Sequence, residues 1–271
     1  MPELPEVETT RRGIAPHVVN KTIRSVAIRQ QQLRWPVPAQ LATILTGRHI
    51  TRVGRRAKYL ICYLEHGCLL LHLGMSGSLR VLDAAVAPHK HDHVDIVFAD
   101  HTCLRLRDPR RFGSIHWTDQ DPQRHPLLQR LGPEPLAADF SGAHLYRRSR
   151  NRTQSIKTFI MDSRIVVGVG NIYASEALFR AGIHPLRKAG NVSRKRYLTL
   201  AGAIKEVLHA ALASGGTTLR NFVGSDGAPG YFKLNLNVYG RADAPCRVCA
   251  GSIRQIRQGQ RSTYYCPGCQ R

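Results

Sequence analysis

The sequence predicts an α+β protein, with a β-rich N-terminal part, a helical part and a small cysteine-rich module at the C-terminal end. Three observations predict it: short β-type segments occur between about residues 22 and 117, helical periodicity begins after residue 140, and two Cys-x-x-Cys pairs lie in the last 35 residues. A length of 271 residues allows one large domain or two moderate ones.

The first ten residues, "MPELPEVETT", predict a helix start. Proline and glutamate suit a first helical turn, because proline needs no amide partner there and acidic side chains oppose the positive end of the helix dipole. This explains Pro5, Glu6 and Glu8. It leaves Pro2 and Glu3, which precede the predicted helix, without an explanation.

The predicted strands are rich in Val, Ile, Leu and Tyr and are separated by turn signals such as "EHGC", "GMSG" and "FADHT". The six segments are "TIRSVAIRQ", "KYLICYL", "CLLLHLG", "SLRVL", "HVDIVFA" and "CLRLRD". Many short strands at this spacing are typical of a sandwich or a barrel. Cys62, Cys68 and Cys103 lie in these apolar runs, and we expect them to be buried as small hydrophobic residues.

The region between about residues 120 and 140 is rich in Pro, Gly and Asp and is predicted to be a linker. Beyond it, "GNIYASEALFRAG" predicts a short helix closed by Gly182. A longer helix is expected between Ser193, a suitable N-cap, and the Gly215-Gly216 stop. Its apolar face recurs at steps of three and four residues and consists of Tyr197, Ala201, Ile204, Leu208 and Ala211.

The chain is strongly basic. Forty Lys and Arg residues against eighteen Asp and Glu give a net charge of +22, and the excess is spread along the whole sequence. Such a charge is best explained by a polyanionic partner, of which nucleic acid is the leading candidate. A solvated basic surface and a ribosome- or membrane-associated protein are the alternatives. The sequence shows neither an apolar run long enough to span a bilayer nor a signal peptide, so a cytoplasmic protein without a membrane partner is expected.

Four cysteines near the C-terminal end predict a structural zinc site. Cys246 and Cys249 form one Cys-x-x-Cys pair, and Cys266 and Cys269 form a second after sixteen residues. Two such pairs complete a tetrahedral thiolate shell and leave no position for a catalytic water. Disulfides do not suit a reducing compartment, and a redox pair would not need four cysteines. The segment between the pairs is expected to form a β-hairpin whose tip carries Arg257, Gln260 and Arg261.

Several separated blocks together resemble the bacterial formamidopyrimidine-DNA glycosylase family. They are "PELPEVE", "RRAKYL", "HLGMSGSL", "DPRRFG", "VGVGNIYASE", "GGTTL", "SDGAPGYF", "VYGR" and the four cysteines. The resemblance covers essentially the whole chain. It implies an N-terminal catalytic β-sandwich domain with flanking helices (1–130), a helix-two-turn-helix DNA-binding domain (131–230) and a four-cysteine zinc finger with one zinc ion (237–271).

The resemblance also implies a bifunctional enzyme that excises oxidised purines, namely 8-oxoguanine and formamidopyrimidines, from duplex DNA and cleaves the strand by β,δ-elimination. Pro2, exposed by removal of Met1, would be the nucleophile, and Glu3 the proton shuttle. Lys58 would contact phosphate and donate a proton in β-elimination, and Arg261 would assist δ-elimination. Glu6 is either a second carboxylate of the pocket or a helix-start residue.

Further positions match family residues that contact DNA. They are His72, His91, Arg110, Arg152, Asn171 and Tyr239. Met75, Arg110 and Phe112 correspond to the trio that fills the space left by the extruded base, with Arg110 reading the opposite cytosine. For each histidine alone, and for Phe112, a structural role would otherwise be expected. The glycine-rich segment 215–231 corresponds to a loop that covers the extruded base.

Three alternatives compete with this interpretation. Endonuclease VIII, a sister family acting on oxidised pyrimidines, typically has Gly where this chain has Leu4 and lacks this arrangement of Met75, Arg110 and Phe112. A catalytically inactive DNA-binding relative is disfavoured because Pro2, Glu3 and Lys58 are present. "GVG" resembles a dinucleotide loop, but the third glycine is missing, so no nucleotide cofactor is expected. We expect a monomer, associated with the nucleoid through duplex DNA that contains damaged purines or abasic sites.

Overall fold

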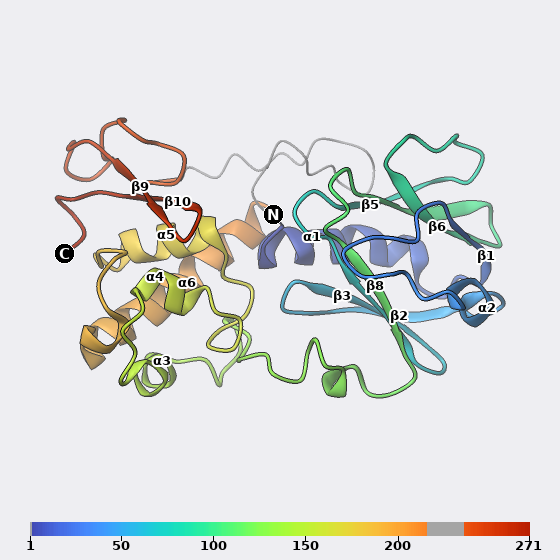
Figure 1. Ribbon diagram of the computed structural model, residues 1–271, viewed down its shortest axis with the longest axis horizontal. Helices are drawn as coiled ribbons and strands as arrows, with labels where there is room; N and C mark the ends of the chain where they lie inside the picture. The colour runs from blue at the N-terminus through green and yellow to red at the C-terminus, as the bar shows by residue number, and fades with distance from the viewer. Residues whose placement is uncertain (1, 216–235) are drawn as a thin grey trace. The chain divides into compact units, whose positions relative to one another are not determined.

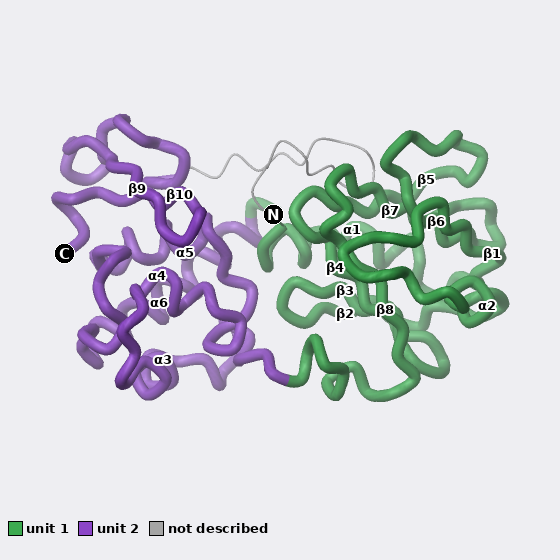
Figure 2. Tube along the Cα trace, in the orientation of Figure 1, with its two compact units in different colours: residues 1–129, 214–233 green, residues 130–213, 234–271 purple. Residues whose placement is uncertain are grey.

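The computed structural model describes residues 2–215 and 236–271 as two compact units (Figures 1 and 2). Unit 1 contains residues 2–129 together with 214 and 215, and unit 2 contains residues 130–213 and 236–271. Within these residues, helices that combine the length and the apolar character needed to cross a bilayer are absent.

Helix α1 (Leu4–Val18) begins unit 1, and Glu3 is its N-cap residue. The Glu6 carboxylate accepts a hydrogen bond from the Glu3 backbone amide at 2.8 Å, as part of a capping box between the two residues. Pro5 lies in the first turn, where no amide donor is required. Glu3, which the sequence left without an explanation, therefore has a structural role at the start of α1.

Unit 1 is built on two four-stranded antiparallel sheets. The first has the order β1-β6-β7-β5 and the second the order β2-β3-β4-β8. The strands of the first sheet are β1 (Ile23–Ile28), β5 (Ser78–Asp83), β6 (Asp92–Phe98) and β7 (Thr102–Arg107). Those of the second are β2 (Ile50–Arg56), β3 (Tyr59–Leu64), β4 (Cys68–His72) and β8 (Ser114–Thr118). All six predicted strand segments are confirmed. Because the strands form two separate sheets, unit 1 is a sandwich rather than a single closed barrel.

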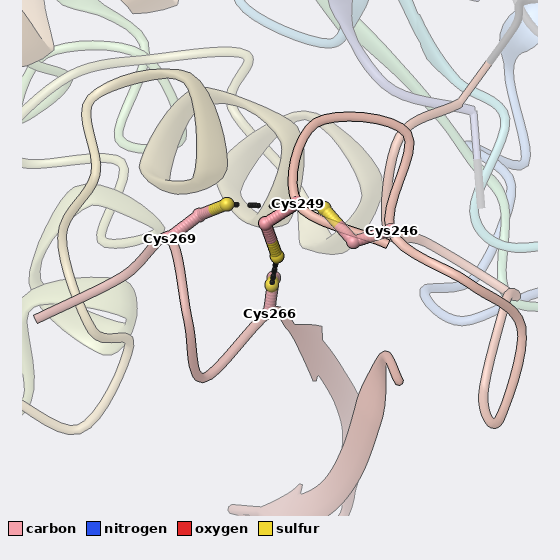
Figure 3. Close-up of side chains that lie close together, drawn as sticks. All are labelled: Cys246, Cys249, Cys266 and Cys269. Carbon is pink, nitrogen blue, oxygen red and sulfur yellow. Dashed lines mark hydrogen bonds between the residues drawn. The ribbon is translucent and has the colours of Figure 1, made fainter. Parts of the chain in front are cut away.

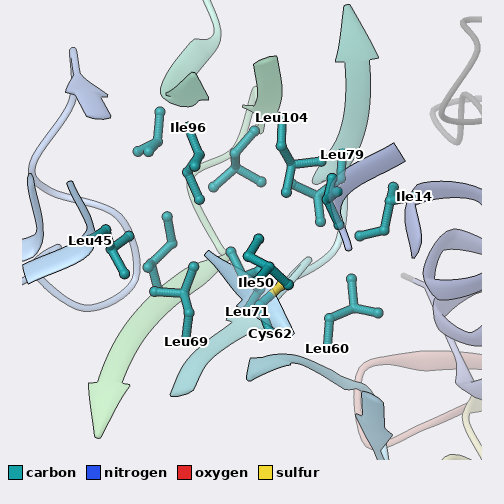
Figure 4. Close-up of a cluster of buried hydrophobic side chains, with 14 of the residues drawn as sticks. Ile14, Leu45, Ile50, Leu60, Cys62, Leu69, Leu71, Leu79, Ile96 and Leu104 are labelled. Carbon is teal, nitrogen blue, oxygen red and sulfur yellow. The ribbon is translucent and has the colours of Figure 1, made fainter. Parts of the chain in front are cut away.

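One hydrophobic core lies between the sheets and takes side chains from both. Leu79, Ile96 and Leu104 come from the first sheet, while Leu60 and Leu71 come from the second (Figure 4). Helix α1 adds Val7, Ile14 and Val18 to this core, and the short helix α2 (Leu41–Leu45) adds both of its terminal leucines. Cys62, Cys68 and Cys103 are buried as expected. Burial raises the pKa of the Cys62 thiol to about 12 and that of Cys68 to about 11.

Unit 2 is helical. Its helices are α3 (Gly142–Ser149), α4 (Ile156–Ile160), α5 (Asn171–Arg180) and α6 (Arg194–Ala213). Two predicted helix boundaries are confirmed. Gly182 has φ +66° just after α5, and the Ser193 hydroxyl accepts a hydrogen bond from the Arg196 amide at the start of α6. The predicted apolar face of α6 is buried, since Tyr197, Ala201, Ile204, Leu208 and Ala211 are all at most 4% exposed.

The predicted linker contains a single turn of 3-10 helix (Pro122–Arg124), and the division between the units falls inside it, at residue 129. The predicted C-terminal hairpin is also present. Strands β9 (Arg254–Gln258) and β10 (Arg261–Tyr265) pair antiparallel. Gly259 and Gln260 form the turn, and both have positive φ. Arg261 directly follows the turn, whereas Arg257 lies within β9 opposite Ser262 and not at the tip.

Candidate active site and zinc centre

The four cysteine sulfur atoms lie together at the base of the β9–β10 hairpin (Figure 3). All four are within 4.8 Å of one another, and the Cys246–Cys269 and Cys249–Cys266 sulfur pairs are 3.8 Å and 3.4 Å apart. Four thiolates about 2.3 Å from one zinc ion stand roughly 3.8 Å apart in a tetrahedron. The cluster therefore fits one structural zinc ion, and every ligand comes from the chain.

The N-terminal carboxylates are buried in unit 1. Pro2 is buried, Glu3 is 2% exposed and Glu6 is 0% exposed. The bond from the Glu3 amide to the Glu6 carboxylate fixes the backbone one residue after Pro2. Pro2 is thus attached to a helix whose start is held by side chains. This geometry would hold the ring nitrogen of Pro2 in one orientation, as a reactive group requires.

Lys58 occupies the second position of the two-residue turn between β2 and β3, because Arg56 pairs with Tyr59. The preceding residue, Ala57, has φ +53° and is buried, and its carbonyl accepts a hydrogen bond from Arg55 at 2.8 Å. The side chain of Lys58 therefore projects from a turn with a defined backbone rather than from a strand start.

His72 lies at the end of β4, directly opposite Tyr59, and the two rings are 4.8 Å apart. Burial, together with the positive charges of Lys58 and Arg34, lowers the pKa of His72 to about 4. The Gly74 amide donates a hydrogen bond to Nδ1 at 3.0 Å, so the neutral ring carries its proton on Nε2. At neutral pH His72 can therefore donate one hydrogen bond without carrying a charge.

Met75, Arg110 and Phe112 are brought together by two adjacent loops, the 74–77 turn and the 108–113 loop. Met75 is 40% exposed and Phe112 is 47% exposed, although both are large and apolar. The Arg110 guanidinium donates a hydrogen bond to the Met75 carbonyl at 3.0 Å and thereby joins the two loops. Exposed apolar side chains beside an arginine form a surface suited to insertion between bases.

Two further residues that are predicted to contact DNA, His91 of unit 1 and Arg152 of unit 2, lie on loops. His91 immediately precedes β6, and its ring is 6.3 Å from that of His93. Arg152 is exposed beyond the end of α3, where its backbone carbonyl accepts a hydrogen bond from the Gly190 amide at 2.9 Å.

In unit 2, Asn171 and Tyr239 meet around a buried lysine that the sequence analysis did not select. Lys157 is 2% exposed, and its ammonium donates to Asn171 Oδ1 at 2.6 Å and to Thr263 Oγ1 at 2.6 Å. Asn171 Nδ2 donates to the Ser262 carbonyl at 2.9 Å and to the Tyr239 hydroxyl at 3.4 Å. These bonds connect α4, α5 and the zinc hairpin. The sequence signal that could have pointed to Lys157 is a charged residue between the apolar residues of "SIKTFI".

A pocket of about 290 Å³ adjoins this network, and its lining includes Lys157, Asn171 and Arg261. The predicted zinc-finger arginine and the predicted phosphate contact of α5 therefore lie on one pocket. Two cationic side chains and an amide make it suitable for a phosphate group.

A second residue that the sequence analysis missed is Glu176, on α5. It is 3% exposed, and its carboxylate accepts hydrogen bonds from the backbone amides of Asn237, Val238 and Tyr239 at 2.8 to 2.9 Å. Glu176 thus holds the chain at the entrance to the zinc finger. The expected covering loop, 215–231, lies outside the described residues apart from Gly215.

Family comparisons match three consecutive parts of the chain. Residues 1–115 match the Formamidopyrimidine-DNA glycosylase N-terminal domain, and residues 131–223 match the Formamidopyrimidine-DNA glycosylase H2TH domain. Residues 244–271 match the zinc finger found in FPG and IleRS. The last match agrees with the geometry of the four cysteines.

Whole proteins give the same result. The formamidopyrimidine-DNA glycosylases of Methylococcus capsulatus and Alkalilimnicola ehrlichii are each 61% identical, with all of both chains covered. The crystal structure of the MutM (Fpg) protein of Thermus thermophilus superposes with a TM-score of 0.88 at 39% identity, covering 99% of this chain and 98% of that one. A point mutant of Lactococcus lactis Fpg in complex with Fapy-dG-containing DNA superposes with a TM-score of 0.92 at 34% identity over all of both chains.

Fold, zinc module and full-length similarity together define a zinc-finger DNA glycosylase of base excision repair. The chain belongs to the formamidopyrimidine-DNA glycosylase family. The expectations of fold, enzyme class and one structural zinc ion are confirmed, and the purine family is favoured over endonuclease VIII and over an inactive binding protein.

Proposed function

We propose that this protein excises oxidised purines, 8-oxoguanine and formamidopyrimidines, from duplex DNA and then cleaves the abasic strand through a covalent intermediate on Pro2. The observation on which the proposal depends is the buried start of α1, where Glu3 and Glu6 hold the backbone beside Pro2. Related proteins of Lactococcus lactis are described in complex with DNA containing an abasic site or Fapy-dG, which supports a DNA substrate of this kind.

Pro2 is suited to nucleophilic attack once Met1 is removed, because its ring nitrogen becomes a secondary amine. An α-amino group has a pKa near 8, so an appreciable fraction is unprotonated at neutral pH, whereas a lysine has a pKa near 10.4. The nitrogen attacks C1′ of the damaged nucleotide, the glycosidic bond breaks, and the base leaves with the bonding electrons and takes up a proton. Opening of the sugar ring gives an iminium ion. This electron sink permits loss of a C2′ proton and expulsion of the 3′ phosphate.

Glu3 is the proton shuttle in this proposal, and Glu6 positions it. A general acid must reach the sugar ring oxygen, and Glu3 adjoins the nucleophile in sequence. Glu6 is completely buried, and its carboxylate accepts from the Glu3 amide, so it acts through the backbone of its neighbour. In this proposal Glu6 serves both suggested roles, because the carboxylate that caps the start of α1 also positions the proton shuttle of the pocket.

The cationic groups bind the DNA backbone and assist the eliminations. Lys58 projects from the β2–β3 turn as phosphate ligand and proton donor in β-elimination, and Arg261 serves the δ-elimination step. His72, His91, Arg152, Asn171 and Tyr239 are the further DNA contacts. A net charge of +22 supports a backbone-dominated affinity, which weakens steeply with salt.

Met75, Arg110 and Phe112 fill the space from which the damaged base is withdrawn. Met75 and Phe112 provide exposed apolar bulk. The guanidinium donors of Arg110 match the O2 and N3 acceptors of an unpaired cytosine. We therefore infer that Arg110 makes excision depend on the base opposite the lesion, with cytosine preferred over adenine.

We infer domain boundaries at 1–130, 131–230 and 237–271, and a monomer in the bacterial cytoplasm associated with the nucleoid. The compact units divide at residue 129, close to the first boundary, which supports it.

Borohydride trapping tests the proposed function. Duplexes that contain 8-oxoguanine or an oxidised pyrimidine are incubated with the protein and borohydride, and the cross-linked peptide is mapped. A cross-link at Pro2 that forms faster with the purine lesion is expected. A cross-link at any other residue, or full activity in a preparation shown by mass spectrometry to retain Met1, would contradict the proposal.

A further inference from the structure

The 74–77 turn and the 108–113 loop are held by one buried carboxylate, Asp108, which is 0% exposed. The Ser76 hydroxyl donates to Asp108 Oδ1 at 2.7 Å, and the Gly113 amide donates to Oδ2 at 2.7 Å. Hydrogen bonds to an ionised acceptor are short and strong, and loss of one partner in a buried site is costly. The two carboxylate oxygens thus fasten the first loop to the far end of the second.

The hydrogen bonds continue from Asp108 to the exposed trio. Ser76 Oγ accepts a hydrogen bond from the Arg110 backbone amide at 3.3 Å, and the Arg110 guanidinium donates to the Met75 carbonyl at 3.0 Å. Phe112 directly precedes Gly113, whose amide is bound by Asp108. Each of the three exposed side chains is therefore linked to Asp108: Met75 precedes Ser76, Arg110 is bonded to Ser76, and Phe112 precedes Gly113.

The backbone of Asp108 extends the same connection to β6. Its amide donates to the His91 carbonyl at 3.0 Å, and its carbonyl lies 2.8 Å from His93 Nε2. Asp108 consequently fixes the segment of a predicted DNA contact, His91, as well as the two loops.

The loops have little space in which to rearrange. Gly74 has φ +59°, and a Cβ atom there would stand 2.3 Å from the Phe112 carbonyl carbon. A Cβ atom on Gly113 would stand 2.9 Å from the His72 carbonyl oxygen. Backbone therefore packs directly on backbone, and the hydrogen bonds of Asp108 select one arrangement of this contact.

We propose that Asp108 is a positioning residue that joins the two loops into one rigid wedge before DNA binds, so that recognition of the opposite base by Arg110 depends on a carboxylate that touches no DNA. This inference rests on the proposed function of Met75, Arg110 and Phe112. Rigid placement avoids the entropy of ordering two loops on the substrate, and small displacements of a positioned group have large effects on rate.

The test compares Asp108→Asn with Asp119→Asn, an exposed residue that follows β8 and serves as the matched control. Excision of 8-oxoguanine is measured opposite cytosine and opposite adenine. Nicking of a single-stranded abasic oligonucleotide, which has no opposite base, is measured in parallel. We expect Asp108→Asn to lower the cytosine-to-adenine ratio about tenfold, as loss of one charged hydrogen bond allows, with single-strand nicking and the control variant unchanged.

A double-mutant cycle separates positioning from a general loss of structure. If Asp108 acts through Arg110, Asp108→Asn lowers the ratio no further in an Arg110→Ala background. An equal decrease in both backgrounds, an unchanged ratio, or a parallel loss of single-strand nicking would overturn the inference. Ser76→Ala, which removes one donor and leaves the carboxylate, provides the same comparison if Asp108→Asn does not fold. Absence of opposite-base preference in the unmodified protein would instead overturn the proposed role of Arg110.

Discussion

Replacing His72 by asparagine should flatten the acid side of the stability profile of unit 1. Burial, with the charges of Lys58 and Arg34, lowers the pKa of His72 to about 4 from an ordinary value of 6.5. At pH values between about 4 and 6.5, the imidazole of His72 is mostly protonated in the unfolded chain and mostly neutral in the folded chain. The contribution of His72 is therefore complete above pH 6.5 and is lost as the pH falls toward 4.

The magnitude follows from the two pKa values. At about pH 5 the unfolded imidazole is almost fully protonated and the folded one is not, which costs about 2 kcal/mol relative to about pH 7.5. His116 also has a pKa lowered by burial and by His125, so a smaller slope remains in the variant.

The assay uses the location of the two tryptophans. Trp35 and Trp117 both lie in unit 1, so their fluorescence during denaturant unfolding reports on that unit. Unfolding free energies are measured near pH 5 and pH 7.5 for the unmodified protein, for His72→Asn and for His66→Asn, an exposed control. A difference between the two pH values that is equally large in His72→Asn and in the unmodified protein would refute the reasoning.

Three further changes test other parts of the structure. Cys249→Ser, or chelation of zinc, should release the β9–β10 hairpin and weaken DNA binding. The zinc content and the DNA affinity of the same preparation are measured, and metal-free protein that binds DNA as tightly as the zinc-loaded protein would contradict this prediction. Glu176→Gln should destabilise the 237–239 segment by about 1–3 kcal/mol, because three backbone donors lose a charged acceptor; amide exchange that stays unchanged there would count against this. Burial raises the pKa of Asp95, but hydrogen bonds from Arg105 and Arg29 outweigh it and lower that pKa below 3.8. Its stabilisation is complete above that pH and is lost in stronger acid, so Asp95→Asn should cost about 3–5 kcal/mol at neutral pH and show a flatter acid-unfolding curve by tryptophan fluorescence.

The strands that could be predicted are those in which apolar residues either form runs, as in β3 and β4, or alternate with polar ones, as in β7. Strand β3 reads "YLICYL" and is buried at four of six positions. Strand β2, which reads "ITRVGRR", was not selected, because three arginines and Gly54 interrupt its apolar pattern. Its membership in the sheet depends on pairing with β3, and pairing between segments is a tertiary property that local composition does not encode. The short helices α2 and α4, of five residues each, were missed because so few residues show no clear period.

The candidate site shows the same limit. The zinc ligands could be identified because two Cys-x-x-Cys pairs are a local sequence pattern typical of a zinc site. The cluster of four sulfur atoms and the zinc-finger family match confirm this prediction. Lys157 and Thr263 are 106 residues apart, and no local pattern connects an ammonium group with a hydroxyl at that distance. Only part of the capping box of α1 could be predicted from the sequence. Proline and glutamate marked the helix start, but the bond between the Glu3 amide and the Glu6 carboxylate emerged only from the backbone geometry.

The exposure of the metal ligands has a consequence for a cell under oxidative attack. Cys249 is exposed, whereas Cys246 and Cys266 are buried. Peroxide or hypochlorite approaching the sulfur cluster meets Cys249 first, and conversion of one thiolate to a sulfenic acid removes a quarter of the ligand shell. With three thiolates left the zinc ion would be held more weakly, and we expect the β9–β10 hairpin to lose order when Cys249 is oxidised.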